Sequence, residues 1–429
     1  MQTMQQYISE MGLEYSQEQF DACLTAFATE MERGLAGEAS SLKMIPAYLD
    51  AQAPPSAGGP VIAIDMGGTN LRIALIEWKD SRMHFLDRRQ YPMPGTQGSL
   101  ERSEFFEQIA EYLLPVADKS DRIGLCFSFP CEILPTLEGK VLNFNKEVSV
   151  RNASGALLGR EIDAALQRAG CRVRHRTCVI NDTVATLLGA RAQAVRNYSG
   201  YIGFILGTGT NSCYREKNSR IQKSEFLREK EGYSLVNLES GGFSGLALNR
   251  VDLAFDARTA APGTQLFEKM ISGAYQGVLA LAYLQDAAQH GLLGPFAAGR
   301  LSELSALHPQ QVDAFCLDPC GENILSQLLP DAQERKAAML LLNGLFDRAS
   351  MLTVCNWTAI LKKMTADGKF DLPYCISAEG STFYKCQPLH TRILSRAEAQ
   401  LNQRLGLSVE IIRAEESTLM GSALAALWG

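Results

Sequence analysis

Two short segments of the chain combine glycine, threonine and asparagine in a pattern that suits anion binding. They read Asp65-Met-Gly-Gly-Thr-Asn70 and Gly207-Thr-Gly-Thr-Asn211. Each lies between two apolar runs, which predicts a strand, a turn that needs the backbone freedom of glycine, and a second strand. Such turns can direct backbone N–H groups and threonine hydroxyls at a phosphate. One glycine-rich turn is usually only a turn, but two copies indicate two related halves that face one nucleotide.

The first turn differs from the common nucleotide-binding motifs. It lacks the lysine of a P-loop, and the apolar alternation after it continues as a strand instead of opening a helix, as GxGxxG would. Asp65, at the end of the preceding strand, suits Mg²⁺ bound directly or through water. The alternative is that Asp65 only caps the turn.

A second group of polar residues follows predicted strands. Ser128 follows one apolar run, Asn145 and Lys146 follow another, and Asn181 and Asp182 stand between a predicted strand and a predicted helix. An Asp at the carboxyl edge of a sheet points into the crevice where ligands bind. The alternative for Asp182 is a helix N-cap.

Three further polar residues complete a set that suits a sugar. Asn211 ends the second glycine turn, and Glu239 and Glu268 lie downstream of it. Carboxylates and amides together suit a polyol, because each hydroxyl both donates and accepts hydrogen bonds. One carboxylate of the set must also accept a proton if a sugar hydroxyl attacks a phosphate. The alternative for Glu268 is a solvated carboxylate on a helix.

Alternating strands and helices must position these residues. Hydrophobic periodicity predicts strands at 61–66, 71–78, 83–91, 123–129, 141–144, 177–180, 374–378 and 408–413, and a strand pair at 201–216. It predicts helices within 1–50 and at 100–114, 160–169, 183–194, 264–287, 301–306, 333–363, 387–404 and 418–428. Residues 51–60 read as a linker. This alternation is typical of the α/β class.

Composition excludes several classes of protein. The 429 residues carry a net charge of −6 without a Lys/Arg cluster, which argues against a nucleic-acid partner. No apolar run approaches roughly 18 residues and the N-terminus does not resemble a signal peptide, so we expect a cytoplasmic protein without a membrane partner. The 11 cysteines form no CxxC pair and the 5 histidines no HExxH. We therefore expect reduced thiols and no metal ligated by the protein itself.

Longer runs, in order along nearly the whole chain, resemble one family. Besides the two glycine turns they are Ser41-Leu-Lys-Met-Ile-Pro-Ala-Tyr48, Phe127-Ser-Phe-Pro-Cys131, Asn181-Asp-Thr-Val184, Pro262-Gly-Thr-Gln-Leu-Phe-Glu-Lys-Met-Ile-Ser-Gly-Ala-Tyr275, Arg348-Ala-Ser-Met-Leu-Thr-Val-Cys355 and Glu379-Gly-Ser-Thr-Phe-Tyr-Lys385. The chain resembles the eukaryotic-type hexokinases and glucokinases of the actin-like ATPase superfamily. The resemblance implies an α/β fold of two actin-like (ribonuclease H-like) domains around a central cleft. The small domain would comprise residues 60–181 plus 415–429, and the large domain residues 1–59 plus 182–414.

The resemblance also implies an activity: transfer of a phosphoryl group from MgATP to the 6-hydroxyl of glucose and related hexoses, the first step of glycolysis. Asp182 would be the catalytic base. The sugar contacts would be Ser128, Asn145, Lys146, Asn181, Asp182, Asn211, Glu239 and Glu268. The ATP contacts would be Asp65, Gly67, Gly68, Thr69, Asn70, Arg72, Gly207, Thr208, Gly209, Thr210, Gly380, Ser381, Ser417 and Thr418. Mg²⁺ would arrive with ATP, near Asp65 and Asp182.

The chain departs from the family pattern in three places. Asn143-Phe-Asn-Lys146 lacks the threonine usual before the lysine, and Ser240-Gly-Gly-Phe-Ser-Gly245 replaces Trp-Gly-Ala-Phe-Gly. Glu415-Glu-Ser-Thr-Leu-Met-Gly421 stands where relatives typically have Gly-Ser-Gly-Lys-Gly. This last change favours the alternative of a hexokinase-like sugar sensor with little turnover. An acetate- or glycerol-type kinase of the same superfamily is disfavoured by the set of sugar contacts.

Overall fold

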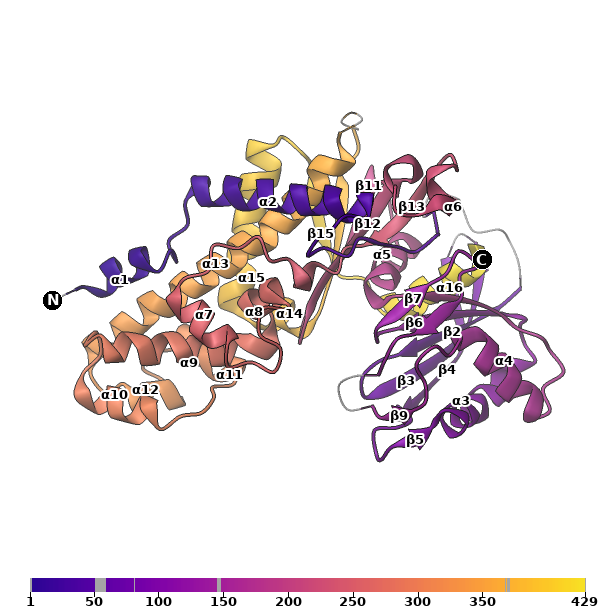
Figure 1. Ribbon diagram of the computed structural model, residues 1–429, viewed down its shortest axis with the longest axis horizontal. Coiled ribbons are helices and arrows are strands. Elements are labelled where there is room, and N and C mark those ends of the chain that lie inside the picture. The colour runs from indigo at the N-terminus through magenta and orange to yellow at the C-terminus, as the bar shows by residue number, and fades with distance from the viewer. Residues whose placement is uncertain are drawn as a thin grey trace.

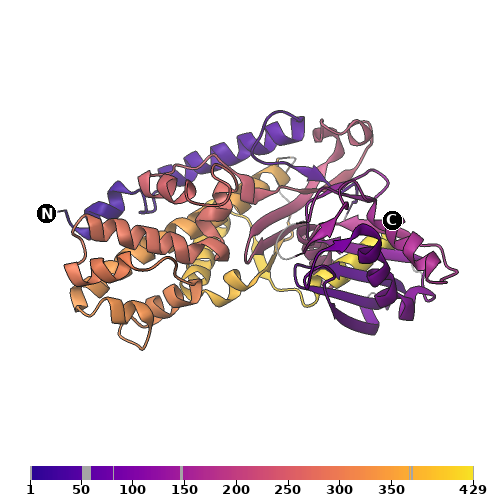
Figure 2. The same ribbon diagram turned by 60° about the horizontal axis from the view of Figure 1, so that its bottom comes forward.

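The computed structural model describes residues 2–50, 59–80, 82–144, 148–366, 368 and 371–428. Along its long axis a helical region is followed by one β-sheet and then by a second β-sheet at the other end (Figure 1). The same succession is visible after rotation (Figure 2). The two sheets carry the predicted site, so their topology decides which residues can meet.

The first sheet has the strand order β10-β6-β2-β3-β4. Its strands are β2 (Val61–Met66), β3 (Asn70–Lys79), β4 (Arg82–Pro92), β6 (Arg122–Phe127) and β10 (Arg176–Ile180). β2, β3 and β4 are antiparallel neighbours, and β6 and β10 run parallel to β2.

Successive residues of the central strand β2 pack on opposite faces of this sheet. Ile62 and Ile64 share a buried cluster with α3 (Arg102–Ala117), whereas Val61 and Ala63 share another with α16 (Ser417–Trp428). Because side chains alternate along a strand, Asp65 lies on the same face as Val61 and Ala63. The first predicted site residue is thus directed toward the C-terminal helix.

The second sheet has the order β1-β13-β12-β11-β14-β15. Its strands are β1 (Ile45–Pro46), β11 (Gly200–Leu206), β12 (Thr210–Lys217), β13 (Tyr233–Asn237), β14 (Tyr374–Glu379) and β15 (Val409–Ile412). β11, β12 and β13 are antiparallel neighbours, while β14 runs parallel to β11 and β15 to β14. Apart from the added edge strand β1, the two sheets share one strand order and one set of directions, as expected of two related halves.

Two helices connect the sheets at their centre. α5 (Asp182–Ala192) contacts β11 and β14, α16 contacts β2 and β6, and α5 and α16 contact each other. A Cβ added to Gly421 of α16 would lie 2.0 Å from the carbonyl oxygen of Ala185 in α5. Only glycine allows the two backbones to approach so closely.

The helical region packs around one long helix, α13 (Ala332–Met364), which contacts α2 (Gln17–Ala36). α13 is long and apolar enough to cross a membrane, but 78% of its most apolar window is buried inside the protein. The helix is therefore a core element, as its packing against α2 indicates.

The other elements are short or lie around these layers. The helices are α1 (Met4–Glu10), α4 (Leu158–Arg168), α6 (Glu225–Arg228), α7 (Arg250–Asp256), α8 (Leu266–Ile271), α9 (Gly273–Gln289), α10 (Pro295–Ser302), α11 (Pro309–Leu317), α12 (Ile324–Leu328), α14 (Ser381–Lys385) and α15 (Gln387–Ala397). Single turns or π-helix form at η1 (Asn218–Arg220), η2 (Ser240–Gly242) and η3 (Glu398–Arg404), and short strands at β5 (Leu100–Glu101), β7 (Cys131–Ile133), β8 (Gly139–Val141) and β9 (Val150–Arg151).

Some predicted elements differ from those observed. The strand predicted at 141–144 is wrong, because β8 ends at Val141. The helix predicted at 264–287 is two helices, α8 and α9, separated at Ser272, whose ψ of 158° is extended. The helix predicted at 301–306 is wrong, since α10 ends at Ser302. Most of the predicted linker lies outside the described residues.

Candidate active site

The register of the first sheet brings its predicted site residues to one edge. Asp65 on β2 is opposite Cys126 on β6, and Cys126 is opposite Ile180 on β10. Ser128 follows β6 and Asp182 follows β10, so both lie at the carboxyl edge beside Asp65. Parallel strands that end together present their following residues at the same edge.

The pKa of the Cys126 thiol reflects the charges at this edge of the sheet. Its pKa lies well above the ordinary value, because of burial and then because of the nearby carboxylates of Asp65 and Asp182. Hydrogen bonding to Asp65 also raises this pKa, and hydrogen bonding to Ser128 lowers it. The neutral thiol thus lies among three of the predicted site residues.

Asp182 is the first residue of α5, and Asn181 is the cap of that helix. The Thr183 N–H donates to Oδ1 of Asn181 at 2.9 Å, and the Thr183 hydroxyl donates to Oδ1 of Asp182 at 3.2 Å. The alternative assignment of Asp182 as the N-cap is therefore wrong. Asn181, predicted as a sugar contact, uses its side-chain oxygen for the cap.

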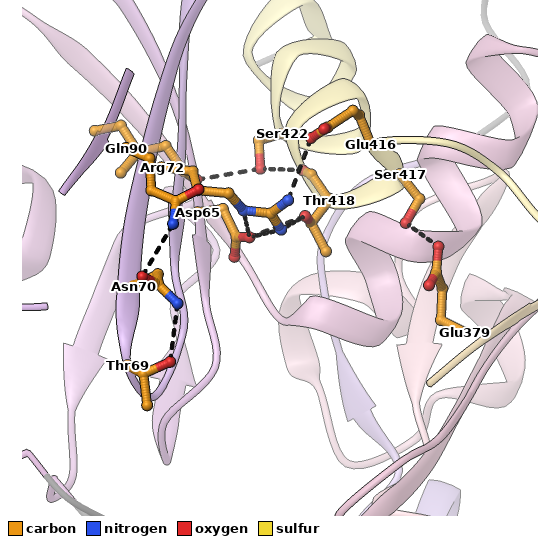
Figure 3. Close-up of polar contacts among 11 residues, drawn as sticks. Asp65, Thr69, Asn70, Arg72, Gln90, Glu379, Glu416, Ser417, Thr418 and Ser422 are labelled. Carbon is orange, nitrogen blue, oxygen red and sulfur yellow. Dashed lines mark hydrogen bonds and ion pairs between the residues drawn. The ribbon is translucent and has the colours of Figure 1, made fainter. Parts of the chain in front are cut away.

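Arg72 and Asp65 form a charged pair in the first glycine segment (Figure 3). Oδ2 of Asp65 accepts from Nε of Arg72 at 3.0 Å, from Nη2 of Arg72, and from the Thr418 hydroxyl at 3.0 Å. Arg72 Nη2 also donates to Thr418 Oγ1 at 2.9 Å, and Nη1 donates to Oε2 of Glu416 at 3.2 Å. Burial lowers the pKa of Arg72, but the carboxylates of Asp65 and Glu416 raise it more.

The tip of the first turn is exposed and ordered by its own polar groups. The Gly67 N–H donates to the Asn70 carbonyl at 3.1 Å, and Asn70 Nδ2 donates to Thr69 Oγ1 at 3.0 Å. Gln90 on β4 donates to Asn70 Oδ1 at 3.1 Å. Thr69 and Asn70 are both exposed, and Gly67 and Gly68 partly so, leaving the turn accessible to a ligand.

The second glycine turn is held from three sides. Oε2 of Glu268 accepts from the Thr210 N–H at 3.0 Å. The carbonyl of Gly207 accepts from the Gly273 N–H at 2.8 Å and from the Thr382 hydroxyl at 2.8 Å. Glu268, predicted as a sugar contact, is thus also a positioning residue for the turn.

Asn211, Asn237 and Glu239 form a compact amide–carboxylate network. Asn211 Nδ2 donates to Asn237 Oδ1 at 2.7 Å and to Glu239 Oε1 at 3.0 Å, and Asn237 Nδ2 donates to Glu239 Oε1 at 2.8 Å. Glu239 has a φ of 57°, a conformation that costs a non-glycine residue energy and is often found at functional sites. The sequence prediction missed Asn237; its place two residues before Glu239 on β13 is the signal that could have found it.

Gly380, Ser381 and Ser417, three more of the predicted ATP contacts, gather around the end of β14. Gly380 has a φ of 110°, and a Cβ there would lie 2.3 Å from the Leu206 carbonyl oxygen, so glycine is required. The Ser417 hydroxyl donates to Oε1 of Glu379 at 2.8 Å. Burial raises the pKa of Glu379, an effect that this hydrogen bond partly offsets.

Of the remaining predicted residues, Thr208 and Gly209 lie in the second glycine turn, and two sugar contacts lie outside the residues that the structure describes. Thr208 accepts from the Ala274 N–H through its carbonyl at 3.1 Å, and a Cβ on Gly209 would meet Oε2 of Glu268. Asn145 and Lys146 lie outside the described residues. In the part of the chain that the structure describes, no three His, Cys, Asp or Glu side chains are grouped so as to hold a metal ion by themselves.

Comparisons with known proteins identify the family to which this geometry belongs. Family models described as hexokinase match residues 5–192 and residues 201–428. Hexokinase-1 of Arabidopsis thaliana is 30% identical over 435 residues, which cover 94% of this chain and 86% of that protein. Hexokinase-7 of Oryza sativa subsp. japonica is 29% identical, with coverage of 95% and 92%. Hexokinase-1 of Schizosaccharomyces pombe is 25% identical, with coverage of 98% and 90%.

Solved hexokinases share the fold. A hexokinase from Schistosoma mansoni complexed with glucose superposes with a TM-score of 0.76 at 23% identity, over 99% of this chain and 100% of that chain. Another hexokinase crystal structure gives a TM-score of 0.82 at 22% identity, over 99% of each chain. The predicted α/β fold of two actin-like domains is confirmed, whereas the predicted domain boundaries stay a prediction. From the two family matches and the extent of the curated relatives, we conclude that the chain belongs to the hexokinase family.

Proposed function

We propose that the chain is an active hexokinase, which transfers the γ-phosphoryl group of MgATP to the 6-hydroxyl of glucose and related hexoses. Membership of the family supports a sugar kinase, and the glucose bound to the Schistosoma mansoni hexokinase supports glucose as the acceptor. The observation that carries the proposal is the strand register that brings Asp65, Ser128 and Asp182 to one sheet edge. There Asp182, the proposed base, lies near Asp65, which we propose faces the phosphates.

In the proposed reaction Asp182 accepts the proton of the 6-hydroxyl while that oxygen attacks the γ-phosphorus. The bond between the γ-phosphorus and the bridging oxygen breaks, and ADP leaves. A positioned base contributes typically about 10²–10⁴ in rate, and most of the remaining acceleration comes from positioning and charge neutralisation. The Asn211–Glu239 network would orient the sugar hydroxyls, and exclusion of water would prevent hydrolysis of ATP.

Mg²⁺ would enter as part of the nucleotide substrate and neutralise charge on the transferred phosphoryl group. Asp65 and Asp182 fit this ion, because carboxylate oxygens are the ligands that Mg²⁺ prefers. Asp65 is only 6% exposed, so its charge acts where water screens it little. We expect the enzyme to work in the cytoplasm, where its reaction would be the first step of glycolysis. We expect no nucleic-acid or membrane partner.

A sugar sensor with little turnover is the second candidate, and one observation favours it. Glu416, in the loop that departs from the family pattern, forms an ion pair with Arg72. An acidic side chain beside the arginine of the first phosphate segment opposes binding of a nucleotide.

Initial rates of ADP release with MgATP distinguish the two candidates. The acceptors are glucose, mannose, fructose, glucosamine and N-acetylglucosamine, with 6-deoxyglucose as the matched control that lacks the attacking hydroxyl. We expect release with glucose and only background release with 6-deoxyglucose. Calorimetric binding of glucose without any glucose-dependent ADP release would favour the sensor.

A further inference from the structure

The loop before α16 joins the two halves of the site through polar contacts. On the side of the first sheet Glu416 and Thr418 contact Arg72, and on the side of the second sheet Ser417 contacts Glu379. Figure 3 shows these contacts converging on the segment that connects the two sheets. The loop therefore lies where a nucleotide between the two glycine segments would have to fit.

All three nitrogens of the Arg72 guanidinium donate hydrogen bonds to the protein. Its Nε and Nη2 bond Asp65, Nη2 also bonds Thr418, and Nη1 bonds Glu416. Arg72 is the one basic residue in the segment from Asp65 to Arg72. A phosphate oxygen that approaches Arg72 therefore competes with these acceptors for the charge of the guanidinium.

Glu416 is the acceptor that a phosphate can replace most easily. The Asp65 side chain is 8% exposed and makes a two-nitrogen contact with the guanidinium, whereas the Glu416 side chain is 36% exposed and makes a single contact at 3.2 Å. Glu416 also has a φ of 48°, which is unfavourable for a residue other than glycine.

Glu416 precedes the first turn of α16, whose 12 residues give it a helix dipole. The N-terminus of a helix attracts negative charge, from a side chain or from a phosphate. Arg72 and the start of α16 thus both attract anionic groups, and Glu416, like Asp65, is a carboxylate that the protein itself supplies there.

We propose that Glu416 is a specificity-determining residue of the donor site, which competes with the donor's phosphate groups for Arg72 and so sets the affinity for nucleotides according to their charge. The inference rests on the proposed function, since it assigns the nucleotide to this site. Replacing the carboxylate by an amide of the same shape releases Nη1 of Arg72 from an ion pair without changing the loop. Nucleotide binding then tightens, and it tightens more for donors with more phosphates.

The test is isothermal titration calorimetry of wild type and Glu416→Gln with ATP, ADP and AMP, in the presence of Mg²⁺ and without sugar. We expect a three- to tenfold lower Kd for ATP, a smaller gain for ADP, and a change of less than twofold for AMP. Glu415→Gln is the matched control, because it makes the same charge change in an exposed neighbour whose hydrogen bonds to Gln193 involve only its backbone. Glu416→Gly, which suits the positive φ, is the second variant.

Equal shifts in Glu416→Gln and Glu415→Gln would overturn the proposal, as would weaker ATP binding by Glu416→Gln or no ATP binding by any variant. Weaker binding would show that Glu416 helps to hold the nucleotide. Hexose-dependent ADP release, measured on the same preparations, separates failure of the proposal for Glu416 from failure of the proposed function. If the nucleotide binds as expected and no variant phosphorylates a hexose, the phosphoryl-transfer proposal fails while the role of Glu416 stands.

Discussion

Asp182 is the residue on which the proposed chemistry depends most. It begins α5, directly after the cap Asn181, and its carboxylate lies close enough to Cys126 to raise the pKa of that thiol. We expect Asp182→Asn to lower kcat by about 10²–10⁴, because the amide cannot accept the hydroxyl proton. Steady-state rates give kcat, and calorimetry should show that glucose still binds. A near-native kcat would contradict the assignment of the base.

Glu239 should act mainly on the sugar. Its Oε1 accepts from both Asn211 and Asn237, so the carboxylate holds these two amides in place. We expect Glu239→Gln to raise the KM for glucose at least tenfold and to change the KM for ATP by less than threefold. The measurement is a pair of saturation curves, one for each substrate, and a change confined to the KM for ATP would place the sugar elsewhere.

Glu268 differs from Glu239 in what it holds. It accepts a hydrogen bond from the backbone of Thr210 in the second glycine turn. From the sequence alone a larger effect on the sugar is expected for Glu268→Gln. The structure adds a role in the turn, so we expect this substitution to raise both KM values by comparable factors. An effect on glucose alone would show that the bond to Thr210 is dispensable.

At this scale the sequence indicates residue types better than it indicates their partners. Asp65, Ser128 and Asp182 are predictable because strand ends and helix starts put them at an edge. The position of Asn237 two residues before Glu239 is a signal, but the contact of Asn237 with Asn211, 26 residues away, is not predictable in this way. The same holds for the contact of Glu416 with Arg72, 344 residues away. No local pattern specifies contacts at such separations.

The pair of helices α5 and α16 is the element that links the two sheets. Gly421 lets their backbones meet, since a Cβ there would lie 2.0 Å from the Ala185 carbonyl oxygen. We expect Gly421→Ala to lower the free energy of unfolding by about 1–3 kcal/mol, because overpacking must separate the helices. Urea denaturation measures the change.

Gly299→Ala is the control for this substitution. Gly299 lies in α10, and an added Cβ would meet no atom within 4 Å. Alanine there should stabilise the helix slightly, by up to about 1 kcal/mol. Equal destabilisation of both variants would show that the contact between α5 and α16 does not depend on glycine.

Among the elements, strands with strong apolar runs are predictable, and interruptions of helices are not. β2 and β11 match their predicted positions closely because apolar runs bounded by glycine are distinctive. The break between α8 and α9 at Ser272 has no proline, and it exists because the Gly273 N–H bonds the second glycine turn. A tertiary contact of this kind overrides local helix propensity.

The stability of the whole molecule should depend on pH through its depressed carboxyl pKa values. Burial raises the pKa of Asp256, but the Lys269 ammonium and the Gly263 N–H together lower it more. Burial likewise raises the pKa of Asp286, but Arg250, Tyr7 and His290 together lower it more. A carboxyl with a lowered folded pKa stabilises the fold above its unfolded pKa of about 3.9, and this contribution is lost as the pH falls through the folded value. We therefore expect the free energy of unfolding to decrease below about pH 4.

Asp256→Asn tests this dependence. The Lys269 side chain is only 1% exposed, so loss of its partner should cost about 3–5 kcal/mol at pH 7. The variant should also lose less stability than wild type between pH 5 and pH 3. Urea denaturation at several pH values measures both effects, and parallel pH profiles would show that Asp256 is not one of the groups responsible.

At the largest scale the molecule contains two sheets of one topology, with a glycine turn after β2 in the first sheet and after β11 in the second. The repetition places one turn on either side of the helices α5 and α16. The sequence predicts this duplication from its two turns, but the added strand β1 and the arrangement of the helical region require the structure. β1 is two residues long and pairs with β13 far along the chain, so no period marks it.

Formation of glucose 6-phosphate from glucose and MgATP tests the central claim most directly. A glucose-6-phosphate dehydrogenase assay measures the product, and a parallel assay measures ADP. The account predicts one glucose 6-phosphate for each ADP, and a rate that falls by about 10²–10⁴ in Asp182→Asn. Tight glucose binding without formation of glucose 6-phosphate, or equal rates for wild type and Asp182→Asn, would contradict it.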